Sequence, residues 1–448
     1  MLPNLYIFLQ TTPVPKDIPL PLPLPEWLLI ILLVVSFLVH ILFVNLMVGG
    51  SILTLISQIK GLKNKDYDTL AHEIANTITV NKSMAVVMGI APLLCINVLY
   101  TIYFYSANAL TGLMWLAIIP LVTIAFLLTY LHKFTWKAME NHKAIHISIL
   151  AIAVLLFLFI PLIFLTNINL MLFPEKWESI KGFISALTLP NVFPRYLHFI
   201  FASLSITGLF LHWYMGRKNY PFENLFTQLT RFELKKKGYS LTLVASLIQF
   251  LIGPIVLLTL PSKGIGWNLV FIIIIGASFA IPAMWIMWKG INGNEKTIDK
   301  DFYKVVILMS ITVVFMGSGR QIYRANSLEK HRELVRLKTE DFKKIKKEAL
   351  TKEKEEETKE VNMSMTLEQK GEKVFNQYCS ACHKPKDKLV GPPITEMASI
   401  YKDNKSGLQN WIKKPGKKRP DYPQMPGFET QLEQDQLDQL SAYILTIK

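Results

Sequence analysis

The chain has 448 residues, of which 51% are hydrophobic and 18% charged, and its formal net charge at pH 7 is +15. So apolar a composition excludes a single soluble domain and indicates a protein that crosses a membrane many times. The positive charge does not indicate nucleic-acid binding, because lysine and arginine gather in short loops between apolar runs, as membrane topology and lipid contact require.

Eight apolar runs are each long enough to cross about 30 Å of hydrocarbon as a helix. The expected spans are 27–57, 83–105, 110–131, 145–173, 194–215, 239–260, 267–288 and 302–323. The stretch before the first span is broken by prolines and lacks a basic leader region, so we expect no cleaved signal peptide and expect the first span to direct insertion. The spans predict an all-α fold, with a polytopic transmembrane helical bundle over residues 1–325.

The basic residues of the loops set the expected orientation. One set of loops is rich in them, and the positive-inside rule places that set in the cytoplasm. The opposite set, with the N-terminal tail, carries only Lys16, Lys176, Lys181, Arg195 and Lys263. With an even number of spans both termini then lie outside, which predicts a multi-pass protein of the bacterial inner membrane with its C-terminal domain in the periplasm.

The composition changes abruptly after Arg324. Residues 326–365 are rich in lysine and glutamate and contain neither glycine nor proline. Pairs such as Glu340 and Lys344 stand at the helical i,i+4 spacing that favours attraction between opposite charges. We therefore expect a charged, partly helical linker that reaches up to about 60 Å and joins the membrane bundle to a small final domain, residues 366–448.

The strongest motif in the final domain is CSACH, residues 379–383. Cys379 and Cys382 are spaced to bond the vinyl groups of a haem, and His383 follows to ligate its iron. Taken alone the motif would also suit a zinc half-site or a redox pair, but no second CxxC completes a zinc site, and Met425 in YPQMPGF supplies a sulfur ligand. Met/His ligation raises the iron potential, which suits an acceptor of electrons from quinol. One covalent haem c is predicted.

Residues 366–448 resemble a small class I cytochrome c. GEKVFNQYCSACH resembles its first helix and haem site, LVGPPI its proline loop, and DQLDQLSAYIL its final helix. The resemblance implies that Gly371 and Tyr443 meet where the first and last helices cross. A run of five cations in this domain is either a docking patch for an acidic, soluble redox partner or a solvated loop. The five are Lys413, Lys414, Lys417, Lys418 and Arg419.

His40, His198 and His212 lie inside apolar spans, where an ionisable side chain is costly and marks a candidate site. His40 and His198 fall in the outer half of the bilayer, and each is predicted to ligate the iron of a haem b. His212 follows His198 by fourteen residues and so returns to nearly the same helix face. This spacing suits one haem near each membrane surface, although an interfacial polar role for His212 stays open.

A further cluster of histidines marks the cytoplasmic loop between the third and fourth spans: His132, His142 and His146. Each is either a partner ligand to an inner haem or an ordinary loop residue. Two arginines near the outer membrane surface, Arg195 and Arg320, are candidates to pair with haem propionates, and the alternative is an interfacial anchor.

The membrane part also resembles subunit I of the cytochrome bd superfamily over most of residues 27–324. VHILFVNLMVGG around His40 resembles the first helix of that family, FPRYLHFIFASLSITGLFLHWYM around His198 its fifth helix, and GSGRQIYR its late Gly-Arg-Gln motif. The resemblance implies that His40 ligates one haem of the active-site pair and that His198 ligates the low-spin haem b. It also implies a second membrane subunit.

The sequence departs from that family where oxygen reduction would need its residues. Asn97 and Gly317 stand where the family has acidic residues, and Ile274 stands near the place of a methionine ligand, although Met284 and Met287 lie on the same span. The outer quinol-binding loop of the family is reduced to PSKGIGW. Oxygen chemistry needs an open iron site and a carboxylate route for protons, so these departures count against it.

Three functions are open at this point. In the first, the chain is a quinol:acceptor oxidoreductase subunit that passes electrons from membrane quinol through one or two b haems to haem c. In the second it is a bd-type oxygen reductase subunit I with a fused cytochrome c domain. In the third, haem-free spans only anchor a cytochrome c. The first is favoured, because an anchor needs one span and no buried His40 or His198, and because Asn97 and Gly317 disfavour the second.

Overall fold

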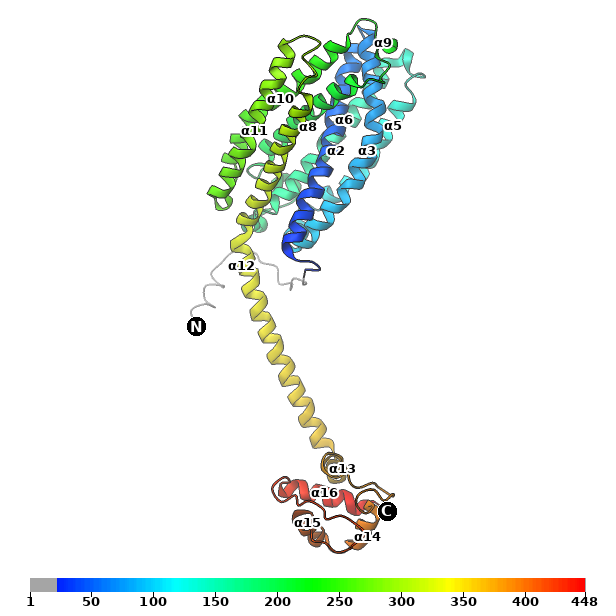
Figure 1. Cartoon of the computed structure of the whole chain (residues 1–448), viewed down its shortest axis with the longest axis vertical. Coiled ribbons are helices and arrows are strands. Elements are labelled where there is room, and N and C mark those ends of the chain that lie inside the picture. Colours follow the sequence, from blue (N-terminus) through cyan, green and yellow to red (C-terminus); the bar gives the residue numbers. More distant parts are fainter. Residues whose placement is uncertain (1–21, 448) are drawn as a thin grey trace. The chain divides into compact units, whose positions relative to one another are not determined.

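The structure is a computed structural model that describes residues 22–447, and for 78–82 and 354–364 it describes the backbone alone. The secondary structure in this part of the chain is entirely helical (Figure 1), so the predicted all-α fold is confirmed. The chain divides into two compact units, Met1–Thr339 and Glu340–Lys448. Lys16 and most of the proline-broken stretch before the first span lie outside the described residues. The expectation that this stretch is not a cleaved signal peptide therefore stays a prediction.

The first unit is a bundle of apolar helices. Seven helices among the described residues are long and apolar enough to cross a membrane, and counting one bent pair as a span brings the number to eight. The seven are α2 (Glu26–Gly61), α5 (Leu113–Phe134), α6 (Lys143–Leu170), α8 (Val192–Gly216), α10 (Arg231–Leu258), α11 (Trp267–Asn292) and α12 (Phe302–Ser364). Large apolar side chains such as Leu116 and Leu251 point outward from them, as a lipid-facing surface requires. The fold is that of a multi-pass membrane protein.

Short helices connect the long ones. They are η1 (Glu140–His142), η2 (Pro174–Ser179), α7 (Phe183–Leu187), α9 (Phe222–Leu225) and η3 (Ser262–Gly264). In η2, the Trp177 indole N–H donates to the carbonyl oxygen of Leu170 at 3.1 Å, which ties this connection to the end of α6. The connections are therefore packed parts of the unit.

Small residues set the closest helix contacts in the bundle. A Cβ atom added at Gly49 of α2 would overlap the carbonyl oxygen of Ser203 on α8, and one added at Gly208 would lie 2.5 Å from the carbonyl oxygen of Gly238 on α10. Membrane helices approach through such small residues because lipid gives no hydrophobic drive to bring them together. The backbones of α2, α8 and α10 therefore touch at these levels and leave no room for a cofactor there.

The second expected span, 83–105, is not one straight helix. Its first part belongs to α3 (Lys65–Leu99), and α4 (Thr101–Thr111) leaves α3 at 109°. Tyr100 between them has φ −128° and ψ 36°, outside the helical region. The Tyr100 hydroxyl accepts a hydrogen bond from Gln321 Nε2 of α12 at 2.7 Å. The break is thus fixed by a residue far away in the sequence, which the hydropathy of the span does not reveal.

A buried carboxylate ties α3 to the loop before α10. Asp66 is 3% exposed and accepts hydrogen bonds from the backbone N–H groups of Thr227, Gln228 and Leu229 at 2.6–3.1 Å. Burial by itself would raise the pKa of Asp66, but these donors together outweigh burial and hold the pKa below its ordinary value. The ionised carboxylate is therefore part of the folded structure.

The second unit contains four helices after the end of α12: α13 (Leu367–Tyr378), α14 (Ile394–Ile400), α15 (Lys405–Lys413) and α16 (Gln434–Thr446). A Cβ atom added at Gly371 of α13 would overlap the Gln439 carbonyl oxygen and lie 2.7 Å from the Cβ atom of Tyr443 on α16. The predicted meeting of Gly371 and Tyr443 is confirmed. Buried Phe375, Leu437 and Leu440 fill the space around the crossing.

The residues expected to form the linker continue the last membrane helix. α12 runs without interruption from Phe302 to Ser364. Its first turns after Arg324 pack on the bundle, because Leu328, His331 and Val335 are buried there at helical spacing. Beyond Asp341 the described side chains of the helix are exposed. The boundary of the linker as a separate element stays a prediction.

Candidate functional site

The CSACH segment forms a tight turn at the end of α13. The backbone N–H groups of Cys382 and His383 both donate to the carbonyl oxygen of Cys379 at 3.0 Å. Neither cysteine forms a disulfide, and Cys379 is buried whereas Cys382 is half-buried. Burial, with a smaller contribution from Cys382, raises the pKa of the Cys379 thiol to about 11. Cys379 is therefore a neutral thiol near pH 7, and both sulfurs lie on one turn.

The tautomer of His383 is fixed by the proline loop. Its Nδ1 lies 2.8 Å from the carbonyl oxygen of Pro392, and since a carbonyl only accepts, Nδ1 carries the proton. Gly391 lies against the ring, where an added Cβ atom would come 2.8 Å from Nδ1. The backbone N–H of Gly391 donates to the Cys382 carbonyl oxygen at 2.8 Å, which holds the loop. The lone pair of His383 is thereby left on Nε2, as a metal-ligating histidine needs.

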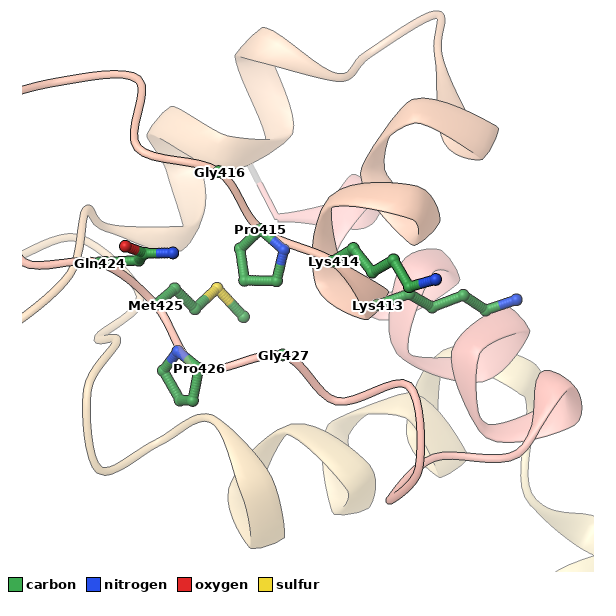
Figure 2. A pocket seen from close by; sticks show the side chains of 8 residues that line it. All are labelled: Lys413, Lys414, Pro415, Gly416, Gln424, Met425, Pro426 and Gly427. Carbon is green, nitrogen blue, oxygen red and sulfur yellow. The ribbon is translucent and has the colours of Figure 1, made fainter.

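Met425 lies in the long loop between α15 and α16. It is half-buried and lines an open cavity of about 600 Å³ together with the loop residues 413–416 and 424–427. Figure 2 shows its thioether projecting into the space between Pro415 and Pro426. The two ends of the loop are joined because the backbone N–H of Phe428 donates to the Ile412 carbonyl oxygen at 3.1 Å. The thioether predicted to ligate the iron is therefore presented on an open, irregular segment.

These residues fit a covalently bound haem. The donor set combines two free thiols on one turn, an imidazole with its lone pair on Nε2 and a thioether at an open cavity. In a haem c, thiols add across vinyl groups to form thioether bonds, and the iron supplies one-electron redox chemistry. Cys379 and Cys382 would hold the porphyrin, with His383 and Met425 as the predicted iron ligands.

Comparison with known proteins places this unit in a class of electron-transfer domains. Residues 368–448 match the family model described as Cytochrome c. The chain therefore carries a cytochrome c domain at its C-terminus, which implies a covalent haem c and a role in electron transfer. A search of curated proteins found no match to the chain.

His198 and His40 of the membrane unit each have one ring nitrogen without a hydrogen bond to the described residues. The Nδ1 atom of His198 is buried and has no hydrogen-bond partner among the described residues, and its Nε2 lies 3.5 Å from Gln249 Nε2. The Nδ1 atom of His40 lies 2.9 Å from the Ala85 carbonyl oxygen and must donate to it, which leaves the lone pair on Nε2. Haem ligation by both stays a prediction.

Three arginines lie near the end of the bundle from which α12 emerges. Arg195, Arg320 and Arg324 form no ion pair with a carboxylate in the described part of the chain. The Nε atom of Arg320 is buried without a partner there, and Arg324, only 7% exposed, donates to Gln321 Oε1 at 2.9 Å. Arg324 is buried and Arg195 and Arg320 are half-buried, so an anionic ligand would stabilise this group of unpaired cations. Arg324, one turn after Arg320, is an addition to the two arginines predicted from sequence.

His212 lies in different surroundings from His198. Its Nδ1 lies 3.2 Å from the Lys235 carbonyl oxygen, and its Nε2 lies 3.2 Å from Asp299 Oδ1. Its ring stacks on Tyr239 and Phe302 at centroid distances of 3.9 and 4.9 Å. Ligation of iron by His212 stays a prediction, and it would have to replace one of the two hydrogen bonds.

Two of the three loop histidines join a closed network of hydrogen bonds. His146 Nε2 donates to the His132 carbonyl oxygen at 2.7 Å, and His146 Nδ1 lies 2.7 Å from the Gln58 side-chain nitrogen. His132 Nε2 donates to Gln58 Oε1 at 2.9 Å, and the two imidazoles stack at 4.0 Å. All three side chains are at most 1% exposed. The network holds α2, α5 and α6 together, whereas His142 is exposed in η1.

One buried histidine escaped the reasoning from sequence. His331 of α12 is 6% exposed, its Nδ1 lies 3.1 Å from the Tyr103 hydroxyl, and its ring packs edge-on against Trp177. It falls in the stretch read as a charged linker. The signal that would have placed it is the apolar spacing of Leu328 and Val335 around it, at i−3 and i+4.

Proposed function

We propose that the chain passes electrons from a membrane quinol through one or two b haems to its haem c, and on to a soluble or partner acceptor. The observation that carries the proposal is the buried, unpartnered Nδ1 of His198 close to Arg195, which no carboxylate in the described part of the chain neutralises. A haem b needs an imidazole for its iron and cations for its two propionates. An apolar bundle that only anchored a cytochrome c would need neither group.

His40 supports the same proposal. Its backbone-fixed tautomer has the lone pair on Nε2, the arrangement that His383 has in the cytochrome c domain. Arg195 and Arg320 would pair with propionates, and the iron would supply one-electron transfer. The protein's own residues would hold the porphyrin and keep water away from it.

A quinol is the proposed donor because it dissolves in the membrane and delivers electrons to a haem one at a time. Its oxidation to quinone releases two protons and two electrons; the electrons would leave through the haems and the protons on the side of haem c. The basic loops support a periplasmic haem c domain in a bacterial inner membrane. The resemblance to bd-type subunits supports a second membrane subunit.

Oxygen reduction is not proposed. At Gly317 an added Cβ atom would lie 2.9 Å from Leu38 Cδ2, so a longer acidic side chain would require Leu38 to move. Asn97 has a buried Oδ1 without a hydrogen-bond partner among the described residues, and an amide does not carry protons as a carboxylate does.

The substitution His198→Ala tests the proposal. In reduced-minus-oxidised spectra of the purified protein we expect loss of a b-haem signal with the haem c signal unchanged. His72→Ala is the matched control, because His72 is also half-buried in the membrane unit but packs on Trp136 at 4.7 Å. A b-haem signal that survives His198→Ala at full height would overturn the assignment.

A further inference from the structure

The five cations that precede Met425 do not simply face solvent. Four of them contact partners in their own domain. The pairs are Lys413 with Gln434 (2.8 Å), Lys414 with Glu429 (3.0 Å), Lys418 with the Trp411 ring (4.4 Å) and Arg419 with Glu396 (2.5 Å). Sequence reasoning left a docking patch and a solvated loop as the two interpretations. The contacts point to a third, in which the cations hold the loop that carries Met425.

The pair of Arg419 and Glu396 joins the two sides of the haem site. Arg419 Nη2 donates to Glu396 Oε1, and Glu396 lies in the first turn of α14. That helix begins two residues after Pro392, whose carbonyl oxygen fixes the His383 ring. Arg419 itself stands six residues before Met425. The ion pair therefore connects the segment that holds the predicted histidine ligand to the segment that holds the predicted methionine ligand.

A second contact makes the same connection. Tyr422, three residues before Met425, has Arg419 Cζ 4.7 Å and Lys388 Nζ 4.3 Å from its ring centroid. Lys388 belongs to the loop between His383 and α14. A cation near an aromatic face is attracted by the ring quadrupole. Two cations from the two sides of the site thus meet at one ring.

We propose that Arg419, Glu396, Tyr422 and Lys388 form a clamp that keeps the Met425 loop closed on the haem iron. They are positioning residues, since none of them would touch the iron. The inference rests on the proposed function, because it takes Met425 as the iron ligand. The loop around Met425 is irregular and lines an open cavity, so it is held by individual side-chain contacts rather than by helical hydrogen bonds. In such a segment even an exposed ion pair changes the open fraction.

Two neutral substitutions separate a clamp from a simple charge effect. If Arg419 and Glu396 act only through charge, Arg419→Gln lowers the reduction potential of haem c and Glu396→Gln raises it. If they form a clamp, both substitutions weaken Met425 ligation. Loss of methionine lowers the potential. The clamp therefore predicts faster displacement of Met425 in both variants, with a contribution to the potential that is downward in both. A charge effect alone predicts potential shifts of opposite sign and an unchanged rate of displacement.

The experiment uses the full-length protein with haem c attached. The readouts are the potential, the methionine-to-iron charge-transfer band of the ferric state, and the rate at which added imidazole displaces the methionine. We expect each substitution to raise the imidazole rate by about two- to five-fold, and the exchanged pair Glu396→Arg with Arg419→Glu to restore much of it. Potentials that move in opposite directions, with wild-type imidazole rates, would overturn the clamp.

Lys405→Gln is the matched control. Lys405 is 46% exposed, as Arg419 is. It forms an ion pair with Asp438 at 2.9 Å, and neither residue belongs to the Met425 loop. It should leave the imidazole rate unchanged. Met425→Ala distinguishes the clamp from the proposed ligand set, because it should abolish the charge-transfer band. If the charge-transfer band persists in Met425→Ala, Met425 is not the iron ligand, and both the ligand set and the clamp are wrong. If the band vanishes in Met425→Ala while the clamp substitutions leave the imidazole rate unchanged, only the clamp is wrong.

Discussion

His383 in the cytochrome c domain and His40 in the membrane unit are oriented in the same way. In each ring Nδ1 donates to a backbone carbonyl oxygen, of Pro392 at 2.8 Å and of Ala85 at 2.9 Å, so the lone pair is on Nε2. The two contacts differ in the sequence separation between the histidine and the residue that accepts its hydrogen bond. Pro392 follows His383 by nine residues, whereas Ala85 lies on another helix, 45 residues from His40.

That difference explains why one short motif marks the whole haem c site, whereas the sequence singles out His40 and His198 but not the residues that surround them. The haem c attachment site is formed by CSACH and the proline loop that follows it, two segments that are close in the sequence and fold against one another. His198 of α8 meets Gln249 of α10, which is 51 residues away in the chain, and only packing brings the two together. The predictions that follow test first the local site, then the packing that supports each unit.

The largest effect is expected at the covalent attachment site. Cys382→Ala should strongly reduce covalently bound haem, because only Cys379 is then left to form a thioether bond with a vinyl group. Haem staining of the denatured protein on a gel measures this directly. Cys95→Ala, at a half-buried cysteine of α3, is the control and should keep wild-type staining. Undiminished staining in Cys382→Ala would contradict the attachment site.

The next largest effect is expected where α13 crosses α16. Gly371→Val would drive its side chain into the Gln439 backbone and Tyr443, so we expect a loss of about 3 kcal/mol or more in the free energy of unfolding of the domain. Thermal unfolding followed at the haem c absorption measures it. Gly416→Val, where an added Cβ atom would meet only the Trp411 ring at 3.6 Å, should cost far less.

A moderate, pH-dependent effect is expected at Asp66. Because its pKa is lower in the folded protein than the ordinary 3.8, the carboxylate stabilises the fold above that pH and loses this contribution as the pH falls towards the folded value. Asp66→Asn should therefore cost about 1–3 kcal/mol near pH 7 and little at low pH.

Thermal denaturation of the purified protein between neutral and acidic pH tests this. The difference between wild type and Asp66→Asn should shrink as the pH drops. Glu140→Gln, at an exposed position of η1, should leave the curve unchanged. A difference that grows on acidification would mean that the sign of the pKa shift is wrong.

The smallest effect is expected at the exposed contact between α2 and α12. Arg332 pairs with Glu26 at 2.7 Å, and both side chains are 44% exposed. Arg332→Gln should change the free energy of unfolding by less than about 1 kcal/mol, because water screens such pairs. Denaturant titration of the membrane unit measures the change. A loss as large as that of Asp66→Asn would show that this end of α12 matters more than its exposure implies.

Much of the fold follows from the sequence because its signals are local. Long apolar runs predicted the membrane helices, and CSACH with its proline loop predicted the cytochrome c domain. The resemblance to cytochrome c placed Gly371 at the helix crossing, and the structure shows that only a residue without a side chain fits there. Each of these features depends on residues that are close in the chain or on one dominant physical term.

What escaped prediction depends on partners that are distant in the chain. The break at Tyr100 is fixed by Gln321, and His331 is buried by Tyr103 and Trp177. Hydropathy reads 83–105 as one span and 326–365 as a charged linker, since it does not weigh a hydrogen bond across more than 200 residues. The network of His132, Gln58 and His146 escaped for the same reason.

The central claim is that the membrane unit carries redox cofactors of its own. A pyridine haemochrome spectrum of the purified protein measures it most directly, because it gives the ratio of b haem to c haem. We expect one or two b haems for each haem c. A ratio of zero would contradict the proposed path through the membrane and leave the apolar helices as the anchor of a cytochrome c domain.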